Sequence, residues 1–60
     1  MEPYTKEELS EARRALVSLI SKCEKAQEKL RPGSSQHTLL INRIKAFRIS
    51  LELIERAMAE

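Results

Sequence analysis

Apolar residues recur every three or four positions in two long stretches of the chain, one on each side of a short polar segment. In the first stretch this spacing continues from Leu9 to Leu30. Such spacing is typical of a helix that presents one apolar stripe to a partner helix. The predicted stripe contains Leu9, Ala12, Leu16, Leu19, Cys23, Ala26 and Leu30, and is widened by Val17 and Ile20. We therefore expect a first helix over roughly residues 6–30, with its opposite side facing water.

The start of this helix carries a capping signal. Thr5 is followed three residues later by Glu8, the combination that forms a capping box. Glu7 and Glu8 also place negative charge at the positive end of the helix dipole. The first helix should therefore begin directly after Thr5.

Residues 31–35 contain a proline, the only glycine and two serines, a composition that predicts a turn. Ser34 or Ser35 can then cap a second helix over roughly residues 36–58. So short a connection between two long helices predicts an antiparallel hairpin. The periodicity allows two registers, one with Cys23 opposite Phe47 and one, about a turn away, with Cys23 opposite Ile44.

The second helix differs from the first because it carries two apolar sets. The set expected to face the first helix is Leu40, Ile44, Phe47, Leu51, Ile54 and Met58. The other set lies about 140° around the helix, at about 100° per residue. It contains Leu39, Ala46, Ile49 and Leu53. A hairpin can cover only one of the two sets, so the second predicts an interface.

The simplest way to cover the second set is a twofold pairing of two hairpins into a four-helix bundle. We therefore expect a homodimer, with a different protein partner as the main alternative. Asn42 and Arg43 lie beside the second set and, if buried in such an interface, could fix its register.

The composition agrees with a single all-α domain over residues 1–60. Sixty residues form a marginal core when they fold alone, and small domains are usually supplemented by disulfides, metal or another chain. With one cysteine and one histidine, the chain can form neither an internal disulfide nor a zinc site of four such ligands. Association with another chain is the supplement that is left.

The charges are nearly balanced, with 11 basic and 9 acidic residues interspersed along the chain. This balance gives no strong case for nucleic acid or an anionic membrane as a partner. Neither a secretory leader nor a membrane-spanning segment is recognisable, so we expect a cytoplasmic protein. The alternative function is a small dimeric nucleic-acid-associated regulator that uses Arg43, Lys45 and Arg48, although these three point in different directions around the helix.

Cys23 and His37 are the two residues with the most reactive side chains, because a thiolate beside an imidazole is a common nucleophile pair. In either register of the hairpin they lie well apart along its axis, and Cys23 falls in the apolar stripe, where cysteine acts as a small hydrophobe. The sequence also lacks paired acids and a phosphate-binding loop. We expect no enzyme activity, and no catalytic, cofactor-binding or metal-binding residues.

Three segments carry a resemblance to a known group of proteins: ISKCEKAQEK at residues 20–29, SQHTLL at 35–40 and NRIKA at 42–46. The chain resembles, over most of its length, a group of short bacterial proteins of Gram-positive type whose function is unknown. The resemblance implies a helical hairpin and supplies no catalytic or binding residues. Together these observations favour a noncatalytic protein–protein interaction module that self-associates as a coiled-coil hairpin.

Overall fold

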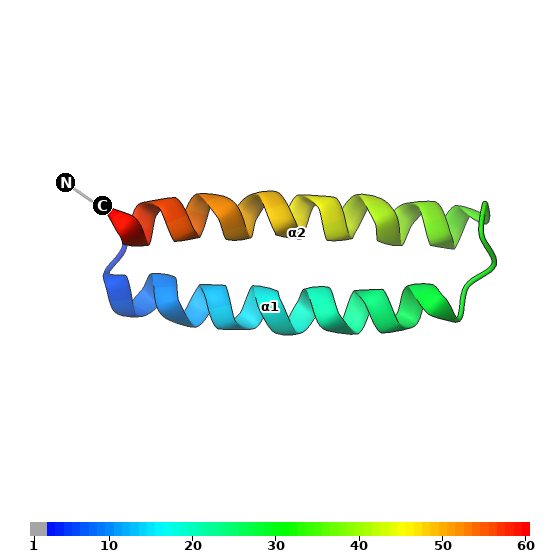
Figure 1. Ribbon diagram of the computed structural model, residues 1–60, viewed down its shortest axis with the longest axis horizontal. Helices are drawn as coiled ribbons and strands as arrows, with labels where there is room; N and C mark the ends of the chain where they lie inside the picture. The colour runs from blue at the N-terminus through cyan, green and yellow to red at the C-terminus, as the bar shows by residue number, and fades with distance from the viewer. Residues whose placement is uncertain (1–2) are drawn as a thin grey trace.

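The computed structural model describes residues 3–60 as two antiparallel helices joined by a turn. Helix α1 comprises Lys6–Glu28 and helix α2 comprises Ser35–Ala59. They lie side by side along their whole length (Figure 1) and form a rod of 44 × 15 × 15 Å. The expected all-α hairpin is therefore confirmed. Within residues 3–60, neither helix combines the length and apolar character needed to cross a membrane.

Helix α1 begins with the expected capping box. Thr5 is extended, and its hydroxyl oxygen accepts a hydrogen bond from the backbone N–H of Glu8 at 3.0 Å. The carboxylate of Glu8 in turn accepts a hydrogen bond from the backbone N–H of Thr5 at 3.0 Å. Two of the N–H groups that have no partner within the helix are thus satisfied.

Helix α1 ends at Glu28, two residues before the expected end. The backbone N–H of Lys29 is shared between the carbonyls of Ala26 and Gln27, and the N–H of Leu30 also bonds to the Gln27 carbonyl. Bonds that reach back only three residues tighten the last turn and end the regular helix.

The turn depends on one glycine and one serine. Gly33 has a φ of +87°, in the left-handed region that residues with a side chain rarely adopt. Ser34 follows it as the cap of α2, where its hydroxyl accepts a hydrogen bond from the backbone N–H of His37 at 3.1 Å. Of the two serines that could have capped α2, Ser34 has this role.

The α2 side of the helix contact is the one expected from the sequence. We call its six residues the inner stripe, and each of them is at least partly buried: Leu40, Ile44, Phe47, Leu51, Ile54 and Met58. Ile44 is the most buried of them, at 8% exposed.

The α1 side differs from the expectation at two places. Ile20 is 7% exposed, whereas Leu19 is 42% exposed. Similarly, Gln27 is partly buried while Ala26 is exposed. At about 100° per residue, Ile20 lies about 20° around the helix from the buried Leu9, and Leu19 about 80° from it. The prediction that Leu19 and Ala26 belong to the contact was therefore wrong.

The core of the hairpin is thin. Within residues 3–60, only Leu9, Ile20 and Ile44 are less than a tenth exposed, and no side chain is completely buried. Apolar burial is the main favourable term in folding. A single hairpin therefore has little of that stabilisation to offset the loss of chain entropy.

Two ion pairs between the helices can be compared with the two registers. Arg13 Nε lies 3.1 Å from Glu55 Oε2, and Arg48 donates to Glu24. In the register with Cys23 opposite Phe47, Arg13 lies opposite Ala57 and Glu24 lies opposite Ala46. Each ion-pair partner, Glu55 or Arg48, is then two residues away from the directly opposite position. In the alternative register, Glu24 would lie opposite Arg43, five residues from Arg48. Arg13–Glu55 fits either register to within two residues, so it is the Glu24–Arg48 pair that supports the register with Cys23 opposite Phe47.

We expect Gly33→Ala to lower the free energy of unfolding by about 1–2 kcal/mol, because an L-residue is strained at this φ. A β-carbon at Gly33 would have no atom within 4 Å, so the loss would reflect backbone conformation and not a clash. Urea unfolding followed by circular dichroism measures it. Gly33→Asn is the matched control and should lose less, because asparagine tolerates the left-handed region. Equal losses for both variants would contradict this explanation.

Candidate interaction surface

The second apolar set of α2 is exposed on the side of the helix that does not contact α1. We call this surface the outer face and define it as Leu39, Asn42, Ala46, Ile49 and Leu53. Its three large apolar side chains are 49%, 54% and 57% exposed for Leu39, Ile49 and Leu53. At about 100° per residue, Leu53 lies about 180° around α2 from the buried Ile44. The hairpin therefore leaves this set uncovered, as the sequence predicted.

The outer face has the spacing of a helix-pairing seam. Its five members follow one another at intervals of three, four, three and four residues. This alternation keeps a stripe in contact with a second helix over several turns. Arg43 is exposed beside the outer face, about 100° around α2 from Ile44. Of the six interface residues predicted from the sequence, the structure thus places five on one face and Arg43 at its edge.

The two long edges of the hairpin differ in charge. The ion pairs Arg13–Glu55 and Glu24–Arg48 lie along one edge. Leu19 lies on the other, because it is about 100° around α1 from Ile20 in the sense opposite to Glu24. Sequence reasoning missed Leu19 as an exposed apolar residue, because the spacing of three and four residues allows either Leu19 or its neighbour Ile20 in the helix contact. Val17 and Ile41, 46% and 40% exposed, line hollows together with Arg48 and so lie near the ion-pair edge. Exposed apolar side chains therefore border both long edges of the hairpin.

The basic residues of the alternative hypothesis do not form a common patch. Arg43, Lys45 and Arg48 are all exposed, but Arg48 is paired with Glu24 across the hairpin. Arg43 and Lys45 lie about 160° apart around α2, at about 100° per residue. Direct contact with nucleic acid stays a prediction, without a shared basic face to support it.

Cys23 and His37 lie about one helical turn apart along the hairpin, closer than expected from the sequence. Cys23 is partly buried in the helix contact as a free thiol. The His37 ring nitrogen Nε2 lies 3.4 Å from the side-chain nitrogen of Gln27, one helical turn beyond Cys23. Within residues 3–60, no group of three or more histidine, cysteine or acidic side chains is arranged to hold a metal ion.

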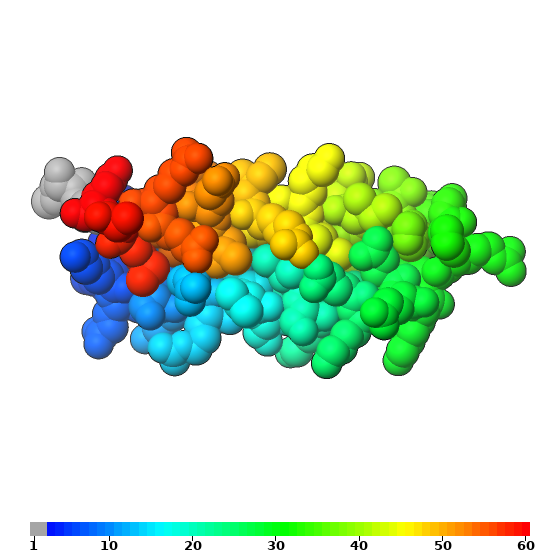
Figure 2. Space-filling model, in the orientation of Figure 1, coloured from blue at the N-terminus to red at the C-terminus, as the bar shows by residue number. Residues whose placement is uncertain are grey.

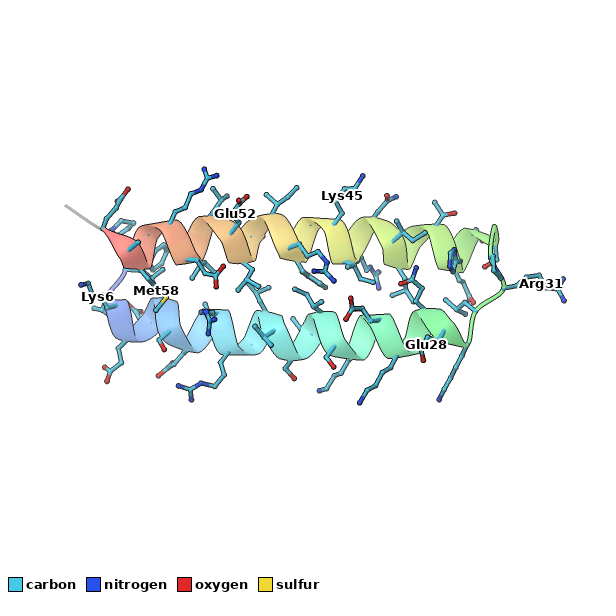
Figure 3. The ribbon with its side chains drawn as sticks, viewed as in Figure 1. Lys6, Glu28, Arg31, Lys45, Glu52 and Met58 are labelled. Atoms are coloured by element: carbon cyan, nitrogen blue, oxygen red, sulfur yellow. The ribbon has the colours of Figure 1, made fainter. Side chains whose placement is uncertain are left out.

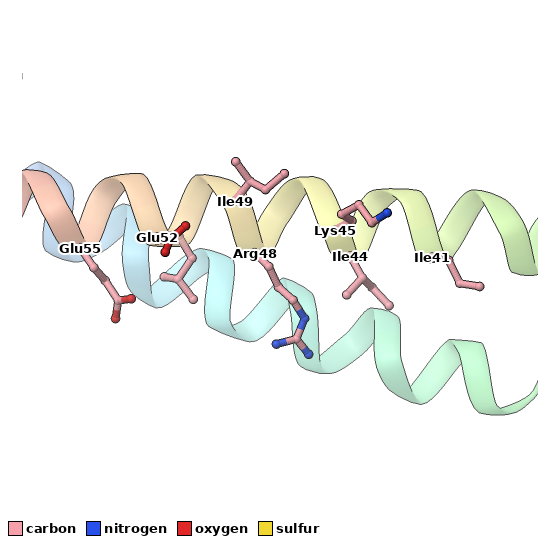
Figure 4. A pocket seen from close by; sticks show the side chains of 8 residues that line it. Ile41, Ile44, Lys45, Arg48, Ile49, Glu52 and Glu55 are labelled. Carbon is pink, nitrogen blue, oxygen red and sulfur yellow. The ribbon is translucent and has the colours of Figure 1, made fainter.

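A shallow depression lies beside the outer face (Figure 4). Figure 4 shows Arg48 and Ile44 directed toward α1, whereas Ile49 points away from it. Every residue that lines the depression belongs to α2: Ile41, Ile44, Lys45, Arg48, Ile49, Leu51, Glu52 and Glu55. A hollow on one helix does not enclose a small molecule as ligand pockets do. The arrangement is suited to contact with another surface.

No protein-family model, curated protein sequence or solved structure matches this chain. The resemblance to short bacterial hairpin proteins stays a hypothesis based on residues 20–29, 35–40 and 42–46.

The ion-pair edge should contribute little to stability. Both side chains of the Glu24–Arg48 pair are about half exposed, and exposed pairs contribute about 0.2–1 kcal/mol. We expect a double-mutant cycle with Glu24→Gln and Arg48→Gln to give a coupling free energy in that range, measured by urea unfolding. The same cycle on Arg13 and Glu55, the other pair between the helices, is the comparison and should give a value in the same range, because both side chains are again about half exposed. A coupling above about 2 kcal/mol for Glu24 and Arg48 would contradict the prediction.

Proposed function

We propose that this chain is a noncatalytic protein–protein interaction module that self-associates through the outer face of α2. The observation that supports the proposal is the exposure of Leu39, Ile49 and Leu53 at coiled-coil spacing. Two hairpins joined in this way form a four-helix assembly in which the same face is used twice, as twofold symmetry requires.

The small core of the hairpin gives association an energetic reason. Each large apolar side chain that becomes fully buried contributes about 1.5–3 kcal/mol. Leu39, Ile49 and Leu53 are each about half exposed, so a twofold dimer would bury the remaining surface of six such side chains. That gain is substantial for this hairpin, because its own core is small: within residues 3–60, three residues are less than a tenth exposed.

The length of the exposed stripe favours a macromolecule as the partner. The outer face extends over 15 residues of α2, from Leu39 to Leu53, and so is about 21 Å long at about 1.5 Å per residue. Only an extended partner, such as a second helix, can cover an apolar stripe of this length. We also propose that the chain is bacterial, as the resemblance implies, and that it is located in the cytoplasm.

We expect the unmodified chain to sediment as a dimer at micromolar concentration and Ile49→Lys to sediment as a monomer, because lysine would place a charge in the interface. Sedimentation equilibrium measures both masses. Val17→Lys is the matched control, since Val17 is also β-branched and is 46% exposed, but lies on α1. This control should remain dimeric.

A folded monomer of the unmodified chain at micromolar concentration would refute self-association. The alternative function would then be tested by a gel shift with DNA and RNA at about 50 mM salt, where phosphate contacts are strong.

A further inference from the structure

Two charged residues beside the outer face indicate how a second copy would lie against it. Lys45 and Glu52 are on the same side of the outer face and, as Figure 3 shows, both point away from α1. They are seven residues apart, about 10 Å along the axis, and therefore do not form a pair within one helix. Lys45 has no ion-pair partner in the described part of the chain, and Glu52 contacts Arg56 at 3.4 Å in a largely exposed pair.

We propose that α2 packs antiparallel against α2 of a second copy, about a twofold axis that passes between Ala46 and Ile49. This inference rests on the self-association proposed above and adds the orientation and register of the partner. In this arrangement Ala46 of each copy lies opposite Ile49 of the other, so a small side chain faces a large one. Lys45 of each copy then lies beside Glu52 of the other, which gives two symmetry-related ion pairs.

Charge selects this register from its antiparallel neighbours. A shift of one heptad in one direction places Lys45 of one copy beside Lys45 of the other. The same shift in the other direction places Glu52 beside Glu52. Like charges in these flanking positions are unfavourable, and flanking charges commonly determine how helices pair. The register with Ala46 opposite Ile49 is the one of the three in which the flanking charges attract.

A parallel pairing lacks this complementarity. It would place Lys45 beside Ser50 and Glu52 beside Ala57 of the other copy, which forms no ion pair. It would also bring the two copies of Arg56 together at the continuation of the seam, where like charges repel. Antiparallel packing avoids this repulsion.

The extent of overlap also favours the antiparallel arrangement. Helix α2 comprises Ser35–Ala59, so an axis between Ala46 and Ile49 passes close to its middle. Each turn of one α2 then has a turn of the other to pack against. The outer face lies about 140° around α2 from the inner stripe. In a square four-helix bundle this angle would be about 90°, whereas faces on opposite sides of a helix are about 180° apart, and the angle in α2 is nearer to the second value. The two α2 helices therefore lie between the two α1 helices.

The proposal is tested by reversing the charges one at a time. In Lys45→Glu, both ion pairs of the dimer become repulsive contacts between two glutamates, and in Glu52→Lys both become repulsive contacts between two lysines. We expect each variant alone to weaken the dimer about tenfold in Kd. In an equimolar mixture of the two variants, both flanking contacts between unlike chains join a glutamate to a lysine, so the mixed dimer should recover the original affinity.

The measurements are sedimentation equilibrium for each variant and native mass spectrometry of the mixture, with one variant isotopically labelled. Lys25→Glu, which reverses the charge of an exposed lysine of α1, is the control and should leave Kd unchanged. Circular dichroism confirms that each variant is still helical.

The outcomes separate this proposal from the one that it rests on. An unmodified chain that stays monomeric refutes both proposals. A dimer whose affinity changes with neither variant leaves self-association intact and refutes the antiparallel register. Two weakened variants that do not combine preferentially in the mixture also refute the register.

Discussion

A helix with one neighbour can bury only one of its sides, and this limit determines the properties of the whole hairpin. Helix α1 comes closer to meeting the limit, because Leu9, Leu16 and Ile20 lie toward α2, although Val17 and Leu19 stay more than two-fifths exposed. Helix α2 does not, because Leu39, Ile49 and Leu53 are apolar on the side away from Ile44 and the α1 contact. The thin core and the large exposed apolar surface are two results of the same geometry.

Side chains of the two helices meet along the full length of the hairpin (Figure 2), but their contacts differ in what they contribute. Apolar contacts, in which Leu9, Ile20 and Ile44 are the most buried residues, contribute more to stability than the exposed ion pairs, which add little. The Glu24–Arg48 pair matters for register, because a shift of one turn would separate Glu24 from Arg48. Packing thus holds the helices together, and charge favours one alignment over another.

Local signals in the sequence predicted local structure well. The capping box at Thr5 and Glu8 and the cap at Ser34 depend on residues at most three positions apart. The inner stripe of α2 was also predictable, since its spacing distinguishes it from the outer face.

Two other features required information that the periodicity does not contain. Leu19 and Ile20 are both apolar and adjacent, so the alternation of three and four residues accommodates either of them in the helix contact. The two registers of the hairpin differ by about one turn, after which the same pattern of apolar residues recurs. Only contacts between distant residues, such as Glu24 with Arg48, distinguish them.

The rod shape of the hairpin affects how the molecule moves in solution. Its radius of gyration is 13.8 Å, compared with about 10 Å for a compact domain of this length. A monomer of this shape experiences more friction than a sphere of equal mass and so diffuses like a larger particle. If two rods lie side by side with their centres aligned, the mass doubles while the length stays the same. Association of this kind would slow diffusion less than an end-to-end arrangement, and an antiparallel pairing of the α2 helices would leave the two turns at opposite ends of the particle.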